Sequence, residues 1–223
     1  MHTYVQSIKT LFEKNANPEQ ATAMKKYMRN QFEYLGIKTP QSKALQKEFF
    51  AQNGLPEISE LDLIVRELWE LPQREYKYVA MGLMDKLGKK LPAGFITTIE
   101  HLIITQSWWD TVDLISTHQV GSMFKKYPKV KTKYLKKWRK SMNLWLRRTT
   151  LLFQLLYKDE TDFDLLRKLI NENLGSDEFF INKAIGWSLR QYAKTDPKAV
   201  KKFVKETKDL HPLSRREAMK HLE

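Results

Sequence analysis

The chain has 223 residues, 42% of them hydrophobic and 12% aromatic, which argues against a disordered protein and is enough for a folded core. It has no cysteine, so thiol catalysis, disulfide bonds and cysteine-ligated metal sites are excluded, and no apolar run approaches the ~18 residues of a membrane span. The formal net charge of +13 indicates a polyanionic partner, nucleic acid ahead of an anionic membrane surface.

Helices are predicted along the whole chain, because apolar residues recur at helical spacing and strand signals are nearly absent. Leu61, Ile64, Val65 and Leu68 follow the i, i+3, i+4, i+7 pattern, and a second apolar stripe begins at Leu144. The sequence therefore predicts an all-α chain of helices of roughly 10–18 residues joined by short turns. Prolines mark the expected helix starts, at Pro18, Pro40, Pro56, Pro72, Pro92, Pro128, Pro197 and Pro212.

An aromatic residue recurs near the expected start of successive helices, at intervals of roughly 35–39 residues. The recurring positions are Trp69, Trp108 or Trp109, Trp145 and Phe180. A period in this range, built from helix pairs, is typical of a HEAT-like helical-repeat solenoid, with an irregular helical bundle as the alternative. We therefore expect one HEAT-like domain over residues 1–223, with a basic concave face that could wrap a duplex.

The positive charge is concentrated between Lys125 and Arg148, where eleven basic residues occur with no acidic residue among them. A block of like charge repels itself unless an anion neutralises it. Aromatic residues such as Tyr134 and Trp138 interleave the block, which places it on a folded surface rather than in a tail. The block predicts a nucleic-acid-binding face, and a generally solvated basic surface is the alternative.

A carboxylate and an indole are expected one above the other on the helix that follows Ser107. Trp109 and Asp113 are one helical turn apart, whereas Trp108 and Val112 share a neighbouring, core-like face. A carboxylate close to an indole is unusual on a basic protein and suggests a functional site. The alternative is a helix start at which Asp110 and Asp113 interact favourably with the helix dipole, and the spacing leaves both open.

Arg148 falls on the apolar stripe formed by Leu144, Leu151 and Leu152. A charge inside such a stripe must be paired or must reach an anion. One interpretation is a clamp on a DNA phosphate, for which the guanidinium fork has suitable geometry. The other is an internal salt bridge to an acidic residue of an adjacent repeat, and the sequence favours neither.

Trp187 lies off the core stripe of its helix and has cationic helical neighbours at Lys183, Arg190 and Lys194. An aromatic side chain ringed by cations suits a nucleic-acid face. The alternative is a partly buried tryptophan with long side chains extending past it to solvent. Tyr27 is a weaker candidate, because its setting among methionines predicts ordinary packing.

At these residues the chain resembles the AlkD family of bacterial DNA alkylation-repair glycosylases, along nearly its whole length. The Trp-Trp-Asp-x-x-Asp segment at 108–113 and the Lys-Ala-Ile-Gly-Trp segment at 183–187 are the most specific matches. Further matches are found at 27–30, 35–40, 66–69, 145–148 and 152–155.

The resemblance implies a HEAT-like fold and a monofunctional glycosylase that hydrolyses the N-glycosidic bond of cationic N3- and N7-alkylated purines in duplex DNA. The family acts without base flipping, which is otherwise general among glycosylases. The resemblance further implies a catalytic cluster of Trp109, Asp113 and Trp187, with Arg148 on the phosphate backbone and Tyr27 a lesser member of the site. A non-catalytic DNA-binding helical solenoid that recognises altered DNA is the alternative function.

Lys183, Arg190 and Arg147 complete the set of residues expected to contact DNA. The five histidines are scattered without the spacing of a helical metal pair, so no metal site is predicted, and no organic cofactor is implied. The expected partner is double-stranded DNA with alkylated purines, without a membrane or an obligate protein partner. We expect a bacterial, nucleoid-associated monomer. A cytoplasmic location is expected because the N-terminus shows no signal peptide.

Overall fold

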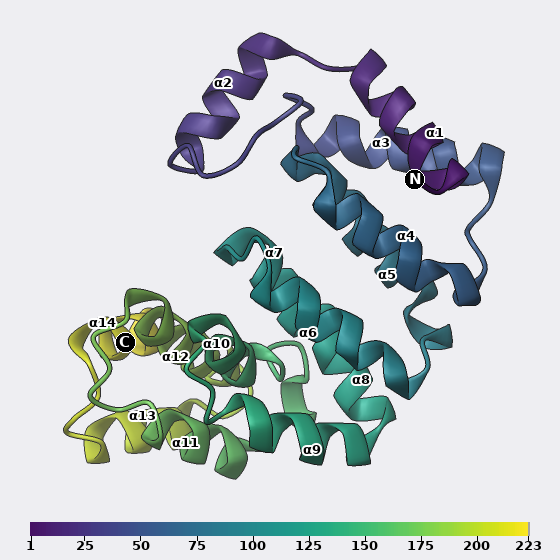
Figure 1. Cartoon of the computed structure of the whole chain (residues 1–223). Helices are drawn as coiled ribbons and strands as arrows, with labels where there is room; N and C mark the ends of the chain where they lie inside the picture. Colours follow the sequence, from purple (N-terminus) through teal and green to yellow (C-terminus); the bar gives the residue numbers. More distant parts are fainter. Residues whose placement is uncertain (223) are drawn as a thin grey trace. The chain divides into compact units, whose positions relative to one another are not determined.

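The computed structural model describes residues 1–222 and consists of helices joined by short connections (Figure 1). No strand is formed within these residues, and the single β-bridge, between Glu33 and Gln73, is isolated. The predicted all-α helical-repeat class is therefore confirmed, while the basic concave face stays a prediction. Each helix of the described part of the chain is too short or too polar to span a bilayer.

The chain divides into two compact units, one formed by residues 1–98 and the other beginning at Ile99. The expectation of one domain over residues 1–223 stays a prediction. The first unit contains α1 (Thr3–Lys14), α2 (Pro18–Tyr27), α3 (Thr39–Asn53), α4 (Ile58–Glu70) and α5 (Arg74–Leu87), followed by the short 3-10 helices η1 (Gly88–Lys90) and η2 (Ala93–Phe95). The boundary between the units falls within α6 (Ile96–Ile104).

The apolar stripe predicted between Leu61 and Leu68 forms part of the core of the first unit. All four of its side chains are fully buried, and α4 packs against α5. Trp69 differs from the prediction, because it lies at the end of α4 instead of near a helix start, and is 1% exposed. Leu71 leaves the helical conformation because the following Pro72 disfavours it, so the helix ends just after Trp69.

Glu75 holds the loop between α2 and α3 in place from the inside of the first unit. Its carboxylate is fully buried and accepts hydrogen bonds from the backbone amides of Leu35, Gly36 and Ile37 at 2.9–3.1 Å. Gly36 has a φ of +87°, and a Cβ added there would lie 2.0 Å from the Asn17 carbonyl oxygen. The matching segment at 35–40 therefore has a structural role in this fold.

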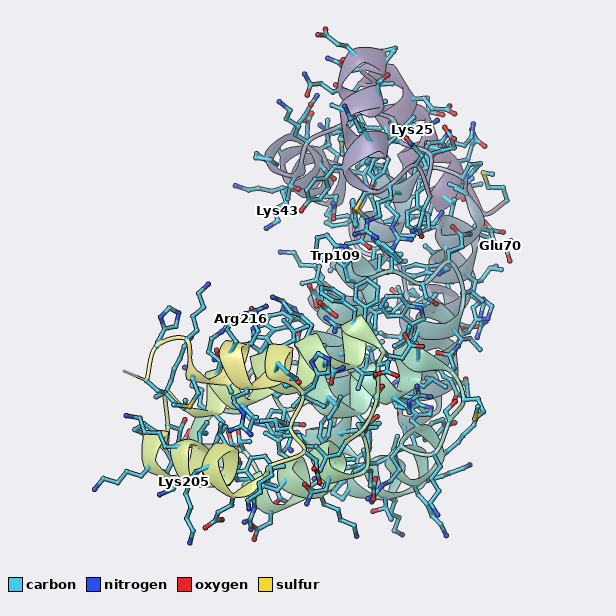
Figure 2. The ribbon with its side chains drawn as sticks, turned by 90° about the vertical axis from the view of Figure 1, so that its left-hand side faces the viewer. Lys25, Lys43, Glu70, Trp109, Lys205 and Arg216 are labelled. Atoms are coloured by element: carbon cyan, nitrogen blue, oxygen red, sulfur yellow. The ribbon has the colours of Figure 1, made fainter. Side chains whose placement is uncertain are left out.

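The second unit arranges its later helices in two layers (Figure 1). One layer holds α9 (Pro128–Trp138), α11 (Phe163–Asn171) and α13 (Pro197–Glu206), and the other holds α10 (Leu144–Leu152), α12 (Phe179–Tyr192) and α14 (Pro212–Met219). Figure 2 shows Lys205 of α13 and Arg216 of α14 on opposite sides of this unit. Proline occupies one of the first two positions of α2, α3, α9, α13 and α14, as predicted.

A continuous helical segment precedes these layers. It comprises α7 (Trp109–Leu114), the π-helical η3 (Ile115–Val120) and α8 (Gly121–Lys126). Leu114 and Val120 both keep right-handed helical torsions, so the segment does not break at either junction. π-Helical turns are rare and frequently mark functional sites, and this one begins two residues after Asp113.

Candidate active site

Asp113 and Arg148 form a bidentate ion pair in the second unit. Arg148 Nε lies 2.7 Å from Asp113 Oδ1, and Arg148 Nη2 lies 2.8 Å from Asp113 Oδ2. The remaining guanidinium nitrogen, Nη1, donates to the backbone carbonyl of Phe180. Arg148 on α10 therefore connects Asp113 on α7 with the first turn of α12, so one side chain ties three helices together.

Of the two interpretations of Arg148, the structure supports the internal salt bridge. Its side chain is 3% exposed and its guanidinium uses both edges within the protein. The acidic partner lies 35 residues away along the chain, at a separation close to one repeat. This geometry assigns Arg148 to positioning Asp113. Because Nη1 and Nη2 each carry a second N–H, the expected contact of Arg148 with a DNA phosphate stays a prediction.

The electrostatics of Asp113 reflect opposing influences. Burial raises the pKa of the Asp113 carboxyl above its ordinary value, while the hydrogen bonds and positive charge of Arg148 oppose this rise. Both carboxylate oxygens accept hydrogen bonds from Arg148, which is the geometry of an ionised group. The Asp113 side chain is 13% exposed, so the carboxylate is the more accessible end of the pair.

Three aromatic residues that recur along the sequence meet beside this ion pair. Trp108, Trp145 and Phe180 have ring centroids 5.0–6.0 Å apart in every pairing. The Arg148 Cζ atom lies 5.7 Å from the centroid of the Phe180 ring. These rings occupy the N-terminal ends of α7, α10 and α12, so the predicted repeat brings equivalent positions together in space.

The two tryptophans of the predicted catalytic cluster are both half-buried. Trp109 is the first residue of α7 and lies one turn before Asp113, as the sequence predicted. In Figure 2 it lies toward the same side of the second unit as Arg216. Trp187 lies on α12, two turns after Phe180, or roughly 10 Å farther along the helix axis. Membership of one catalytic cluster stays a prediction for Trp187.

Lys183 and Arg190 are both bound to Glu217, a residue that sequence reasoning did not single out. Lys183 Nζ lies 2.7 Å from Glu217 Oε1, and Arg190 Nη1 donates to Glu217 Oε2. The hydrogen bond from Lys183 holds the pKa of Glu217 below its ordinary value, and Arg190 acts in the same direction. Two of the cations expected to ring Trp187 therefore share one carboxylate partner, which offsets one of their two positive charges.

Arg147 supports the loop before α10. Its Nη1 atom donates to the carbonyl oxygens of Ser141 at 2.8 Å and of Met142 at 3.2 Å. Asn143 caps the helix by accepting hydrogen bonds from two backbone amides of its first turn. The local structure thus assigns Arg147 a role in loop geometry, and its expected contact with DNA stays a prediction.

The basic block between Lys125 and Arg148 is partly neutralised by acidic residues from outside it. Because α9 carries much of the block and lies in the layer opposite α10 and α12, the block does not surround the candidate site. Five other lysines of the block are exposed, namely Lys126, Lys129, Lys133, Lys136 and Lys140. The neutralised pairs are Lys125 with Glu160, Lys137 with Glu100, and Arg139 with Glu172.

Tyr27 is not packed in a core, contrary to the expectation from its neighbours. It ends α2 in the first unit with 73% of its surface exposed, whereas Met28 is buried. Helical spacing from Met24 predicted packing for both side chains, but the helix ends at Tyr27 and the chain turns away, with left-handed torsions at Arg29 and Asn30. Exposure leaves its expected contact with DNA open as a prediction.

No group of three or more His, Asp or Glu side chains within residues 1–222 is placed to hold a metal ion. The described residues around Asp113 offer an oriented carboxylate with half-buried indoles nearby. A carboxylate can stabilise a developing positive charge, and indole faces attract cations.

Comparisons with known proteins relate this chain to the repair of alkylated DNA. Residues 8–222 match the family model described as DNA alkylation repair enzyme. A predicted DNA alkylation repair enzyme from Enterococcus faecalis is similar, with 35% identity and a TM-score of 0.85 over 93% of this chain and 96% of that chain. Smu.31 from Streptococcus mutans UA159 shares the fold, with 16% identity and a TM-score of 0.60 over 82% and 98% of the two chains.

A search among curated proteins gave no match. The family model covers nearly the whole chain, and the Enterococcus faecalis protein is similar over nearly the full length of both chains. This chain therefore belongs to the DNA alkylation repair enzyme family.

Proposed function

We propose that the chain is an AlkD-type monofunctional DNA glycosylase that excises cationic N3- and N7-alkylated purines from duplex DNA. The observation that carries this proposal is the Asp113 carboxylate, which Arg148 fixes in orientation while leaving it partly exposed beside Trp109. Family membership supports a role in the repair of alkylated DNA.

Alkylation at purine N3 or N7 leaves a positive charge on the base, which then departs as a neutral molecule. The leaving group needs no proton, so the reaction requires no general acid. What helps is stabilisation of positive charge as it moves from the base to the sugar. A carboxylate supplies this, as in glycoside cleavage through an oxocarbenium-like transition state.

The Asp113–Arg148 pair suits this task because its negative end is the more exposed one. Asp113 is 13% exposed and Arg148 only 3%, so an approaching sugar meets the carboxylate and not the guanidinium. Each carboxylate oxygen has a second lone pair besides the one that Arg148 occupies. We propose that these lone pairs face the sugar and help to place the attacking water.

Trp109 and Trp187 would contact the cationic nucleotide through their indole faces. Such cation–π contacts are worth on the order of 0.5–2 kcal/mol each, depending on desolvation. Both side chains are half-buried and so accessible from the surface. We propose that the nucleotide is bound there without being flipped into an enclosing cavity.

The test is single-turnover release of bases from duplexes that each carry one defined lesion, followed by mass spectrometry. We expect 7-methylguanine and 3-methyladenine to be released, and uracil and hypoxanthine to be retained. Comparable rates for a cationic and a neutral lesion would require a general acid, which the proposed mechanism lacks. Binding to methylated DNA with no release of any base would support a non-catalytic DNA-binding protein instead.

A further inference from the structure

Glu217 on α14 binds two cations that flank Trp187 on α12. Lys183 lies one helical turn before Trp187 and Arg190 lies one turn after it. The Lys183 and Arg190 side chains are 39% and 24% exposed, whereas Glu217 is only 12% exposed. One largely buried carboxylate therefore pairs with two cations, one on either side of the tryptophan, and offsets one of their two positive charges.

Gly186 allows this carboxylate to lie directly against α12. A Cβ added at Gly186 would lie 2.5 Å from Glu217 Cβ and 2.9 Å from the Ser214 carbonyl oxygen. Because no side chain separates the two helices at this point, Glu217 sits between Lys183 and Arg190, next to the residue that precedes Trp187. The Lys-Ala-Ile-Gly-Trp segment thus includes a glycine that makes room for an acidic residue from another helix.

A site that receives a cationic base has an electrostatic problem if free cations surround it. Lys183 and Arg190 have Cβ atoms within about 5–6 Å of the Trp187 Cβ, as neighbours on the helix surface. Without a counter-charge, both would attract the DNA phosphates but would repel a cationic base lying on the Trp187 ring. Glu217 offsets one of the two positive charges and so weakens that repulsion in the vicinity of Trp187.

We propose that Glu217 is a specificity-determining residue, which lowers the positive charge around Trp187 and so favours a cationic base over a neutral one. This inference rests on the proposed function, in which Trp187 contacts the alkylated nucleotide. Glu217 acts through Lys183 and Arg190 and is not itself a catalytic residue. It therefore governs the preference for lesion charge more than the affinity for DNA as such.

The preference can be measured as a ratio of two affinities in the active protein. Single-turnover excision from a duplex with one 7-methylguanine, followed against enzyme concentration, gives the half-saturating concentration. Competition by the same duplex carrying guanine gives the affinity for the neutral base. We expect Glu217→Gln to bind the guanine duplex as tightly as, or more tightly than, the unaltered protein, while the preference for 7-methylguanine falls roughly twofold at low salt. This corresponds to one additional uncompensated charge at roughly 10 Å in a water-like dielectric.

Two further variants separate charge from mere loss of packing between α12 and α14. Lys183→Gln leaves Glu217 with Arg190 alone, so the preference should rise above that of the unaltered protein. The triple variant Lys183→Gln, Arg190→Gln, Glu217→Gln has the same local charge of zero as Lys183→Gln and should show the same raised preference, even if its affinity for every duplex is lower. The control is Glu172→Gln, which breaks the Glu172–Arg139 pair in the other part of this unit.

If Glu217 had only a structural role, the affinities of the variants would follow a different pattern. Glu217→Gln would then weaken binding of both duplexes equally, and the triple variant would be no better. Either an unchanged ratio in Glu217→Gln or an equal fall in Glu172→Gln would overturn the inference while leaving the proposed function standing. If the unaltered protein showed no excision and no preference for 7-methylguanine, the proposed function would fail and this inference with it.

Discussion

Glu75 in the first unit and Asp113 in the second are both acidic side chains drawn into the protein, but their partners differ in kind. Glu75 is fully buried and accepts three backbone amide hydrogen bonds, so loop geometry occupies its carboxylate. Asp113 is held by a single guanidinium, remains 13% exposed and has acceptor capacity left. Burial alone therefore does not mark a functional carboxylate; what matters is whether an oriented oxygen still reaches the surface.

The largest expected effect is on folding and comes from Glu75. Glu75→Gln replaces one acceptor oxygen with an NH2 group, which then faces backbone N–H groups that are themselves donors. The charge-assisted hydrogen bonds are also lost. We expect the free energy of unfolding to fall by about 3–5 kcal/mol, measured by urea denaturation. Glu70→Gln, at an exposed position of α4, is the control and should change it by less than about 0.5 kcal/mol. A small loss at Glu75 would mean that the loop does not depend on its charge.

Arg148→Gln should affect stability and the pH dependence of excision together. It leaves the Asp113 carboxylate largely buried without its counter-charge, which is expected to cost roughly 2–4 kcal/mol. Since burial already raises the Asp113 pKa, loss of Arg148 should raise it further. Excision requires the ionised carboxylate, so the rate should fall as pH falls, and this fall should occur at a higher pH in the variant.

The pH dependence of the free energy of unfolding has the opposite sign to that of the excision rate. A pKa raised in the folded state means that the folded protein binds a proton more readily than the unfolded chain. Ionisation of Asp113 therefore lowers the free energy of unfolding as pH rises from the unfolded pKa through the folded one. The measurement is the pH profile of the single-turnover excision rate. If the profiles of Arg148→Gln and the unaltered protein coincide, Arg148 does not control the pKa of Asp113.

Smaller effects are expected at the two half-buried tryptophans. Trp109→Leu and Trp187→Leu each remove one indole face, and excision of 7-methylguanine should slow by roughly 3- to 30-fold. Trp69→Leu is a useful contrast, because Trp69 is a core residue of the first unit and should affect mainly unfolding. The excision rates of the three variants are compared after correction for the folded fraction. If Trp109→Leu and Trp187→Leu slow excision no more than Trp69→Leu does, the two indoles are excluded from the site.

Much of the fold could be predicted because its signals are local. The α4 stripe and the prolines at helix starts depend on spacing within a few residues. The prediction was wrong at Trp69, where one proline ends the helix early, and at Tyr27, where the helix terminates before its side chain can pack. In both cases the position of a helix end, and not the helical pattern, decided the environment of the side chain.

The candidate site was predicted only in part, because its decisive contacts join distant segments. Trp109 and Asp113 share a helix, and their spacing was informative. Arg148 left two interpretations open, and only the folded chain shows that Asp113 is its partner. Glu217 gave no local signal, since its two partners lie 27 and 34 residues away on another helix. Gly186 was the one available clue, as a glycine inside a helix often allows a close approach.

The most direct test of the account compares Asp113→Asn with the double variant Asp113→Asn, Arg148→Gln for both excision and unfolding. Asparagine keeps the shape of Asp113 but not its charge, so release of 7-methylguanine should fall by at least about 100-fold. The double variant leaves no unpaired buried charge and should recover stability, but not excision. A rate for Asp113→Asn within about twofold of the unaltered protein, or recovery of excision together with stability, would contradict the central claim that Asp113 supplies the catalytic charge.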